Sequence, residues 1–196
     1  MHFRHVYHCA VLLLGLPFLS GCKWFDKDRQ QPKNASADTY YSIKGFLDDQ
    51  WRFLEGQPIV LLRVATFNGK SDSSFVSLDS MVWKEIRKQF DASDIGEPRF
   101  LGQYDFSMYN EEALNQIVLS YTAKNRDLLT QKINIGMDNV NHQVRTVYIE
   151  THKGNRTYEK TQKLTYIPRQ VISIQAFEKS IISRPENLRV AYYFKY

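Results

Sequence analysis

The chain contains little of what marks several classes of protein. Its 196 residues include two cysteines, nine glycines and six prolines. Two cysteines cannot build a disulfide-rich scaffold, and so few glycines and prolines exclude a collagen-like or low-complexity chain. Beyond residue 22 no apolar run is long enough for a transmembrane helix. Because 43% of the residues are hydrophobic and 14% aromatic, the chain is not wholly disordered, and we expect one soluble globular domain with an appendage.

The first 22 residues have the layout of an export signal. Arg4 precedes an apolar run over residues 6–19, which is too short and too poorly flanked for a durable membrane span. The run ends in Leu19-Ser20-Gly21-Cys22, which resembles the bacterial lipobox. The resemblance implies cleavage between Gly21 and Cys22 and lipidation of Cys22, and two or more acyl chains attach a protein stably to a membrane. The alternatives are an uncleaved anchor helix or a buried apolar segment.

Processing would remove nearly all the groups that support thiol or metal chemistry. Residues 1–21 carry Cys9 and three of the five histidines, and lipidation would consume the Cys22 thiol. The mature chain would keep His142 and His152 and no free thiol. Cysteine nucleophiles, CxxC redox chemistry and thiolate metal sites are thereby excluded, so we expect no cofactor and no metal.

Three regions follow from this arrangement. We expect a signal peptide over residues 1–21, the lipidated cysteine with a flexible polar tether over residues 22–39, and a single globular domain over residues 40–196. Lys23 stands where an aspartate would retain an enterobacterial lipoprotein in the inner membrane. The expected location is therefore the outer membrane on its periplasmic face, with surface display as the alternative.

Two segments of the domain have the apolar spacing of amphipathic helices. The first covers residues 42–54, where Ser42 is a suitable N-cap. The second begins at Asp79 or Ser80, and its apolar residues repeat every four positions up to Phe90. Both helices lie in the first third of the domain.

Strand patterns dominate the rest of the domain. Residues 59–67 are apolar and β-branched, and Asn68-Gly69 predicts a hairpin turn to a partner strand near residues 74–77. Further strand candidates are residues 99–106, 117–123, 133–137, 144–151, 156–166, 170–177 and 188–196, with a short helix over 171–181 as the alternative for one of them.

The order of elements predicts the fold class. Two helices followed by a run of short strands predict an α+β fold, with the helices packed on one face of an antiparallel β-sheet meander. A mostly-β half-barrel carrying two helices is the alternative. The aromatic residues near the C-terminus suit a covered strand, or else an edge strand that binds a partner.

Short landmarks are spread through the domain: Asp72-Ser73, Asp79, Trp83, Asp94-Ile95, Gly102, Tyr104, Tyr121, Leu164, Tyr166 and Pro168. In these landmarks the chain resembles envelope lipoproteins common in Bacteroidota. The resemblance covers residues 43–174 and implies an envelope location but no particular activity.

Candidate catalytic residues are few. His142 and His152 would lie about 30 Å apart along a strand, so they cannot share a metal ion, and we expect both in turns. A glycosidase needs two carboxyl groups about 5–10 Å apart across a cleft, and no carboxylate pair here lies in a known motif. We therefore expect no catalytic residues and keep a hydrolase with a carboxylate site as an alternative. The pairs are Asp48-Asp49, Glu111-Glu112, and Asp91 with Asp94.

A basic stretch over residues 142–169 alternates with tyrosines. Its plainer interpretation is a solvated sheet face. The sharper hypothesis is a site for an anionic glycan or lipid that uses Arg145, Lys160 and Lys163. We do not expect nucleic acid as a partner, because an exported protein meets little of it.

These observations favour a membrane-anchored, non-catalytic binding or accessory module of the envelope. Its expected partners are the membrane, through the N-terminal lipid, and an envelope protein or glycan. The sequence does not indicate an oligomeric state.

Overall fold

The structure is a computed structural model in which residues 39–195 are described. The expected signal peptide and Cys22 lie outside the described residues, as does nearly all of the expected tether. No helix in residues 39–195 is long and apolar enough to cross a membrane. In chain order the elements are α1 (Ile43–Leu54), β1 (Val60–Phe67), β2 (Lys70–Ser77), α2 (Ser80–Asp91), η1 (Pro98–Phe100), β3 (Tyr104–Glu111), η2 (Glu112–Leu114), β4 (Gln116–Ala123), β5 (Thr130–Asp138), β6 (Val144–Gly154), β7 (Tyr158–Ile167), β8 (Val171–Ser180) and β9 (Glu186–Lys195).

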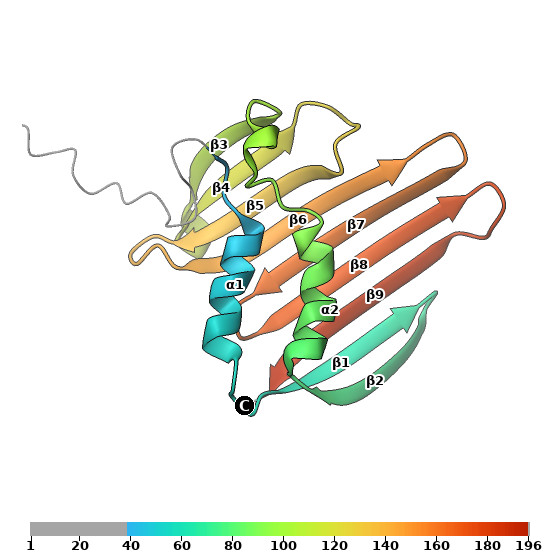
Figure 1. The fold of residues 1–196 in the computed structure, drawn as a ribbon, viewed down its shortest axis with the longest axis horizontal. Coiled ribbons are helices and arrows are strands. Elements are labelled where there is room, and N and C mark those ends of the chain that lie inside the picture. Colours follow the sequence, from blue (N-terminus) through green and yellow to red (C-terminus); the bar gives the residue numbers. More distant parts are fainter. Residues whose placement is uncertain (1–38, 196) are drawn as a thin grey trace, which may run out of the picture. The chain divides into compact units, whose positions relative to one another are not determined.

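The nine strands of residues 39–195 form one antiparallel sheet, and its strand order differs from a simple meander. The order is β2-β1-β9-β8-β7-β6-β5-β4-β3 (Figure 1). Strands β3 to β9 follow one another as expected, but the β1–β2 hairpin joins beyond β9, with Val60 opposite Lys195. The mostly-β alternative therefore fits better than the α+β meander.

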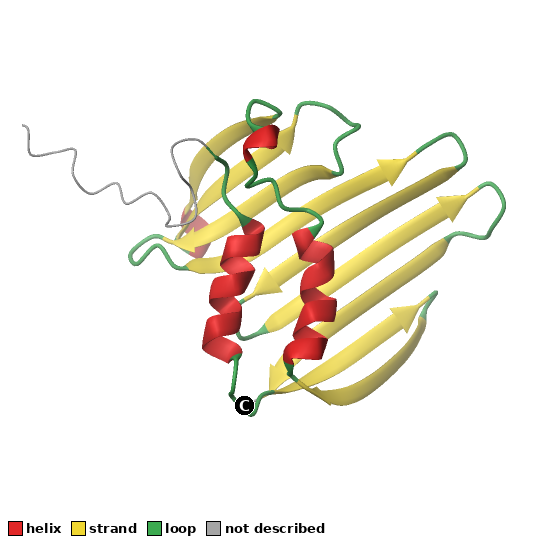
Figure 2. Cartoon of the chain, in the orientation of Figure 1, coloured by secondary structure: helices red, strands yellow, loops and turns green. Residues whose placement is uncertain are grey.

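The two helices lie side by side on one face of this sheet (Figure 2). Alternate residues of each strand point to this helix-covered face, and they supply the buried core. We call the opposite side the free face. In the central strands it is marked by Tyr148, Lys163, Ser173 and Tyr193, which the register places on one side of the sheet.

Both helices begin at the predicted caps. The Ser42 hydroxyl accepts a hydrogen bond from the Gly45 amide at 3.0 Å, and Asp79 accepts bonds from the amides of Met81 and Val82. The start of α1 has a second, distant cap, because the Ile43 amide donates to Oδ1 of Asp94 at 2.6 Å. The segment after α2 thus fixes the position of α1.

A cluster of aromatic rings joins the helices to β7. The ring of Tyr166 meets those of Phe46, Trp83 and Phe90 edge-on, with centroids 5.4, 6.3 and 6.4 Å away. Trp51 of α1 stacks on Trp83 of α2 at 5.6 Å. Edge-on and offset-stacked rings are the favoured aromatic geometries, so this cluster is a main source of packing energy.

Several boundaries differ from the sequence predictions. The strand expected over 99–106 begins only at Tyr104, because Pro98 opens a short 3-10 helix and Gly102 takes a φ of +77°. Residues 171–180 form a strand and not the alternative helix. The C-terminal strand β9 lies between β1 and β8, so it is not an edge available to a partner.

Candidate functional site

The carboxylate pairs considered from the sequence are engaged in local contacts. Arg87 donates to Asp48 at 2.6 Å and to Asp91 at 2.9 Å, which ties α2 to α1. Asp49 pairs with Arg52 at 3.0 Å, and Glu111 accepts a bond from Gln116 at 2.6 Å. These contacts join α1 to α2, lie within one helix, or link the end of β3 to the start of β4, so these carboxylates have a structural explanation that needs no substrate.

The two histidines lie at different ends of β6. His142 is in the β5–β6 turn with a φ of +55°, as expected. His152, expected in a turn, lies within β6, and its Nε2 is 3.4 Å from Oε1 of Glu159. In the described part of the chain no three His, Cys, Asp or Glu side chains come together as a metal site.

The structure does not bring Arg145, Lys160 and Lys163 together. Lys160 and Lys163 point to opposite faces of β7, because they lie three positions apart along the strand. Lys160 forms an ion pair with Glu178 on the helix-covered face. Lys163 is opposite Glu150, five residues from Arg145, which corresponds to about 16 Å along the strand. These three residues therefore do not form one basic patch.

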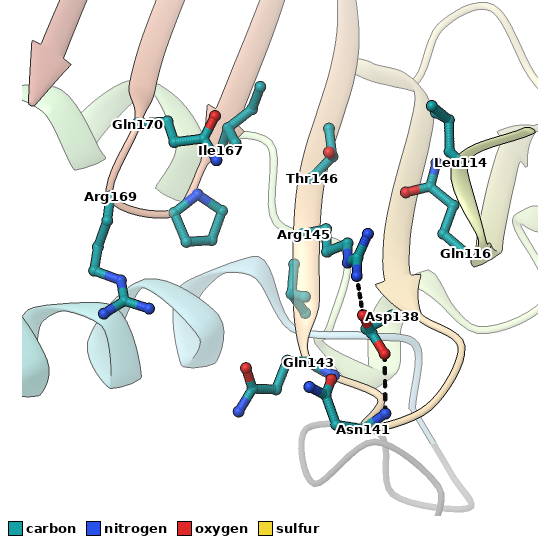
Figure 3. A pocket seen from close by; sticks show the side chains of 12 residues that line it. Leu114, Gln116, Asp138, Asn141, Gln143, Arg145, Thr146, Ile167, Arg169 and Gln170 are labelled. Carbon is teal, nitrogen blue, oxygen red and sulfur yellow. Dashed lines mark hydrogen bonds and ion pairs between the residues drawn. The ribbon is translucent and has the colours of Figure 1, made fainter.

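Arg145 lines a pocket of about 500 Å³ on the free face. The pocket lies where the β5–β6 turn and the β7–β8 turn come together at one end of the sheet (Figure 3). Its polar lining includes Gln116, Asp138, Asn141, Gln143, Arg145, Arg169 and Gln170, and its apolar lining includes Leu114, Val144, Ile167 and Pro168.

A β-bulge and an ion pair set the position of Arg145. The register between β5 and β6 shifts between Gly136 and Met137, which leaves Arg145 as the extra residue of β6. Such bulges re-aim a side chain. The Arg145 guanidinium pairs with the Asp138 carboxylate (Figure 3).

Asp138 remains ionised over the neutral range. Its Oδ1 accepts hydrogen bonds from the amides of Asn141 at 3.0 Å and Val140 at 2.8 Å. These backbone bonds, together with Arg145, lower the pKa of Asp138 below its usual value. The carboxylate therefore holds the turn and the Arg145 guanidinium together except in acid.

The second turn holds Arg169 in an unusual conformation. The Gln170 amide donates to the Ile167 carbonyl at 3.0 Å, which closes the turn over Pro168 and Arg169. Arg169 has a φ of +58°, a region that favours glycine at this turn position. The strain is on the order of 1 kcal/mol. Within residues 39–195 its guanidinium forms no ion pair, so Arg169 is available to a ligand.

The pocket therefore combines one fixed cation, one available cation and several amides. Asp138 offsets the charge of Arg145, and Arg169 leaves the lining with a net charge of about +1 at neutral pH. The amides of Asn141, Gln143 and Gln170 offer both donors and acceptors.

Sequence reasoning identified Arg145 but not the residues that complete its site. Asp138 ends β5 and Arg169 follows β7, and these two strands finish at the same end of the sheet on either side of β6. The local signal was Pro168 in the segment Ile167-Pro168-Arg169-Gln170, since proline favours the second position of a tight turn, whereas nothing in the sequence indicates the positive φ of Arg169.

Comparisons with known proteins identify no family for this chain. No family model matches it, and no curated protein matches it. Among solved structures, a LolA superfamily protein from Nitrosomonas europaea is similar at 10% identity with a TM-score of 0.27. That similarity covers 78% of this chain and 92% of the other.

Proposed function

We propose that this chain is a lipid-anchored envelope protein whose domain binds an acidic saccharide in the pocket on the free face, without transforming it. The observation that carries the proposal is Arg169, a cation with no ion pair among residues 39–195 that is held at a glycine-like backbone position on the pocket wall. Strained residues of this kind concentrate at binding and active sites.

The charge of the ligand follows from the two arginines. A guanidinium binds carboxylate or phosphate oxygens through two parallel hydrogen bonds. Arg169 has no carboxylate partner within residues 39–195, and Arg145 is already oriented by Asp138. An acidic group that enters the pocket meets one guanidinium that is pre-positioned and another that is unpaired.

The saccharide character follows from the rest of the lining. Hydroxyl groups both donate and accept, and so do the amide side chains of Asn141, Gln143 and Gln170. Ile167 and Pro168 add an apolar surface suited to the C–H face of a sugar ring. A long acyl chain would instead need a predominantly apolar lining.

The membrane anchor is proposed from Leu19-Ser20-Gly21-Cys22. Radiolabelled palmitate should enter the wild-type protein, and the Cys22→Ala variant should carry no label. Globomycin should block processing and leave a precursor. Cys9→Ala is the matched control, because that cysteine lies in the expected signal peptide, and it should retain full labelling. A labelled Cys22→Ala protein would exclude the anchor.

Binding can be tested with the full chain in detergent by calorimetric titration with oligogalacturonate. Arg169→Ala should weaken binding by about tenfold to a hundredfold, because a hydrogen bond to a charged group contributes about 1.5–3 kcal/mol. Raising the salt concentration should also weaken binding, since the contact is partly exposed.

Lys163→Ala is the matched control for that titration. Lys163 is an exposed cation on the same face but outside the pocket lining, so its removal should change affinity less than twofold. Equal losses of affinity in Arg169→Ala and Lys163→Ala would indicate that the ligand binds a diffuse basic surface and not the pocket. Binding to vesicles of anionic phospholipid but not to oligogalacturonate would replace the saccharide with a lipid, and cleavage of the oligomer would favour the hydrolase alternative.

A further inference from the structure

The sheet ends at two edge strands of different character. At one edge, β2 carries Lys70, Asp72 and four serines, a largely polar composition that discourages pairing with another strand, and Phe75 is its one large exposed apolar side chain, 69% exposed. At the other edge, β3 exposes 54% of Phe106, 62% of Met108 and 48% of Tyr109. Exposed apolar edge strands are templates for pairing with a further strand.

The outward hydrogen-bonding groups of β3 can be assigned from the ladder it forms with β4. The Lys124 amide donates to the Gln103 carbonyl at 3.0 Å, so odd-numbered residues of β3 bond to β4. Even-numbered residues therefore direct their amides and carbonyls to the open edge. The Tyr40 hydroxyl donates to the outward carbonyl of Tyr104 at 3.0 Å, which agrees with this assignment.

We propose that β3 pairs with β3 of a second copy of this chain, antiparallel about a two-fold axis at Ser107. In that register Phe106 lies opposite Met108 of the second copy, and the reverse pair repeats the contact. Sulfur–aromatic contacts of this kind are favourable. On the other face, Asp105 lies opposite Tyr109 of the second copy, where the phenol can donate to the carboxylate.

Neighbouring registers are less favourable. An axis at Met108 would place Asp105 opposite Glu111 of the second copy, and like charges directly opposite one another are destabilising. An axis at Phe106 would make Tyr104 part of an inner hydrogen-bonded pair, although its outward carbonyl already accepts from Tyr40. The axis at Ser107 places the uncommitted groups of Phe106 and Met108 in the inner hydrogen-bonded pairs and leaves Tyr104 to an outer pair, opposite Asn110 of the second copy.

The point where the chain enters the domain is compatible with this dimer. The Tyr40 ring contacts Tyr104 and Tyr121 on the helix-covered face, with centroids 5.8 and 5.4 Å away. A two-fold axis perpendicular to the sheet keeps the helix-covered faces of both copies on one side. Both chains therefore enter their domains from the same side of the dimer, which is compatible with the two proposed anchors lying in one membrane. The pairing itself depends neither on the pocket nor on the anchor.

Disulfide trapping of Ser107→Cys in the full chain tests the pairing in membranes. Residues facing each other in a non-hydrogen-bonded pair have Cα atoms about 4.5 Å apart, within the range of a disulfide. Under mild oxidation the Ser107→Cys protein should become predominantly a disulfide-linked species of twice the chain mass. Adding Met108→Lys should reduce its yield at least tenfold, because it places two ammonium groups in the apolar pairs.

Ser73→Cys is the matched control, since Ser73 is an exposed serine on β2, the opposite edge strand. Equal dimer yields from the two variants, or a yield that survives Met108→Lys, would show random collision and overturn the proposal. A cross-linked species of another mass would show that a different protein pairs with β3. Oxidation of the wild-type chain tests the anchor separately. If Cys22 is not lipidated, its free thiol would form disulfides without any introduced cysteine.

Discussion

Replacing Tyr166 with alanine should lower the free energy of unfolding by about 3–5 kcal/mol, the usual cost of removing a large buried aromatic side chain. The side chain is 0% exposed and lies at the centre of the aromatic cluster. Its ring meets Phe46 of α1 and Trp83 and Phe90 of α2, so the cavity would open between both helices and the sheet. The neighbouring rings are held by the helices and cannot close such a cavity.

Urea unfolding followed by circular dichroism measures this loss. Tyr166→Phe keeps the ring and removes only the hydroxyl, which donates to Oε1 of Gln50 at 3.4 Å, so its cost should be about 1 kcal/mol or less. Phe53→Ala is the surface control, because Phe53 is 71% exposed, and it should change stability by less than about 0.5 kcal/mol. A loss below about 1 kcal/mol for Tyr166→Ala would contradict the packing described for the helices.

Replacing Asp94 with alanine should cost about 2–3 kcal/mol, more than an ordinary helix cap. The buried carboxylate accepts from the Ile43 amide at 2.6 Å, and a hydrogen bond to a charged group contributes about 1.5–3 kcal/mol. The contact joins residues 51 positions apart in the chain. Gly96 packs so closely that a Cβ there would lie 2.7 Å from Cβ of Ser42, which leaves no room for the segment to shift.

The comparison for Asp94 is Asp79, which caps α2 locally. Asp79→Ala should cost about 1 kcal/mol, the typical value for a cap at an exposed helix end. Asp94→Asn keeps an acceptor near the Ile43 amide and should recover at least half of the loss. Equal costs for Asp94→Ala and Asp79→Ala would show that the distant contact adds nothing beyond capping.

Local chemistry explains how much of the fold the sequence predicted. Ser42 and Asp79 cap the helices at the predicted positions, and Asn68-Gly69 forms the predicted turn with φ values of +46° and +84°. Each of these features depends on residues within a few positions of one another. The sequence predicts the start of β3 too early, at residue 99, because the 3-10 helix Pro98–Phe100 and the turn at Gly102 precede Tyr104.

Features that depend on distant residues were not predictable in the same way. Nothing in β1 indicates that it pairs with β9, because apolar strands pair with many partners. The pocket depends on a bulge at Arg145 and on two turns that come together at one end of the sheet. Both features are set by how distant strands pair, which the sequence does not show. The opposite directions of Lys160 and Lys163 follow from their spacing of three positions along a strand, which the hypothesis of a shared site did not take into account.

The pairing of β1 with β9 also determines when the domain can fold. Residues near the N-terminus of the domain, such as Val60, complete their hydrogen bonds only with residues such as Lys195 at the other end. When a chain emerges N-terminus first from the ribosome or from a translocation channel, the β1–β2 hairpin has no partner for β1 until β9 has emerged. Long-range pairing of this kind slows folding. The exposed hairpin is thus the segment most in need of protection from aggregation during synthesis.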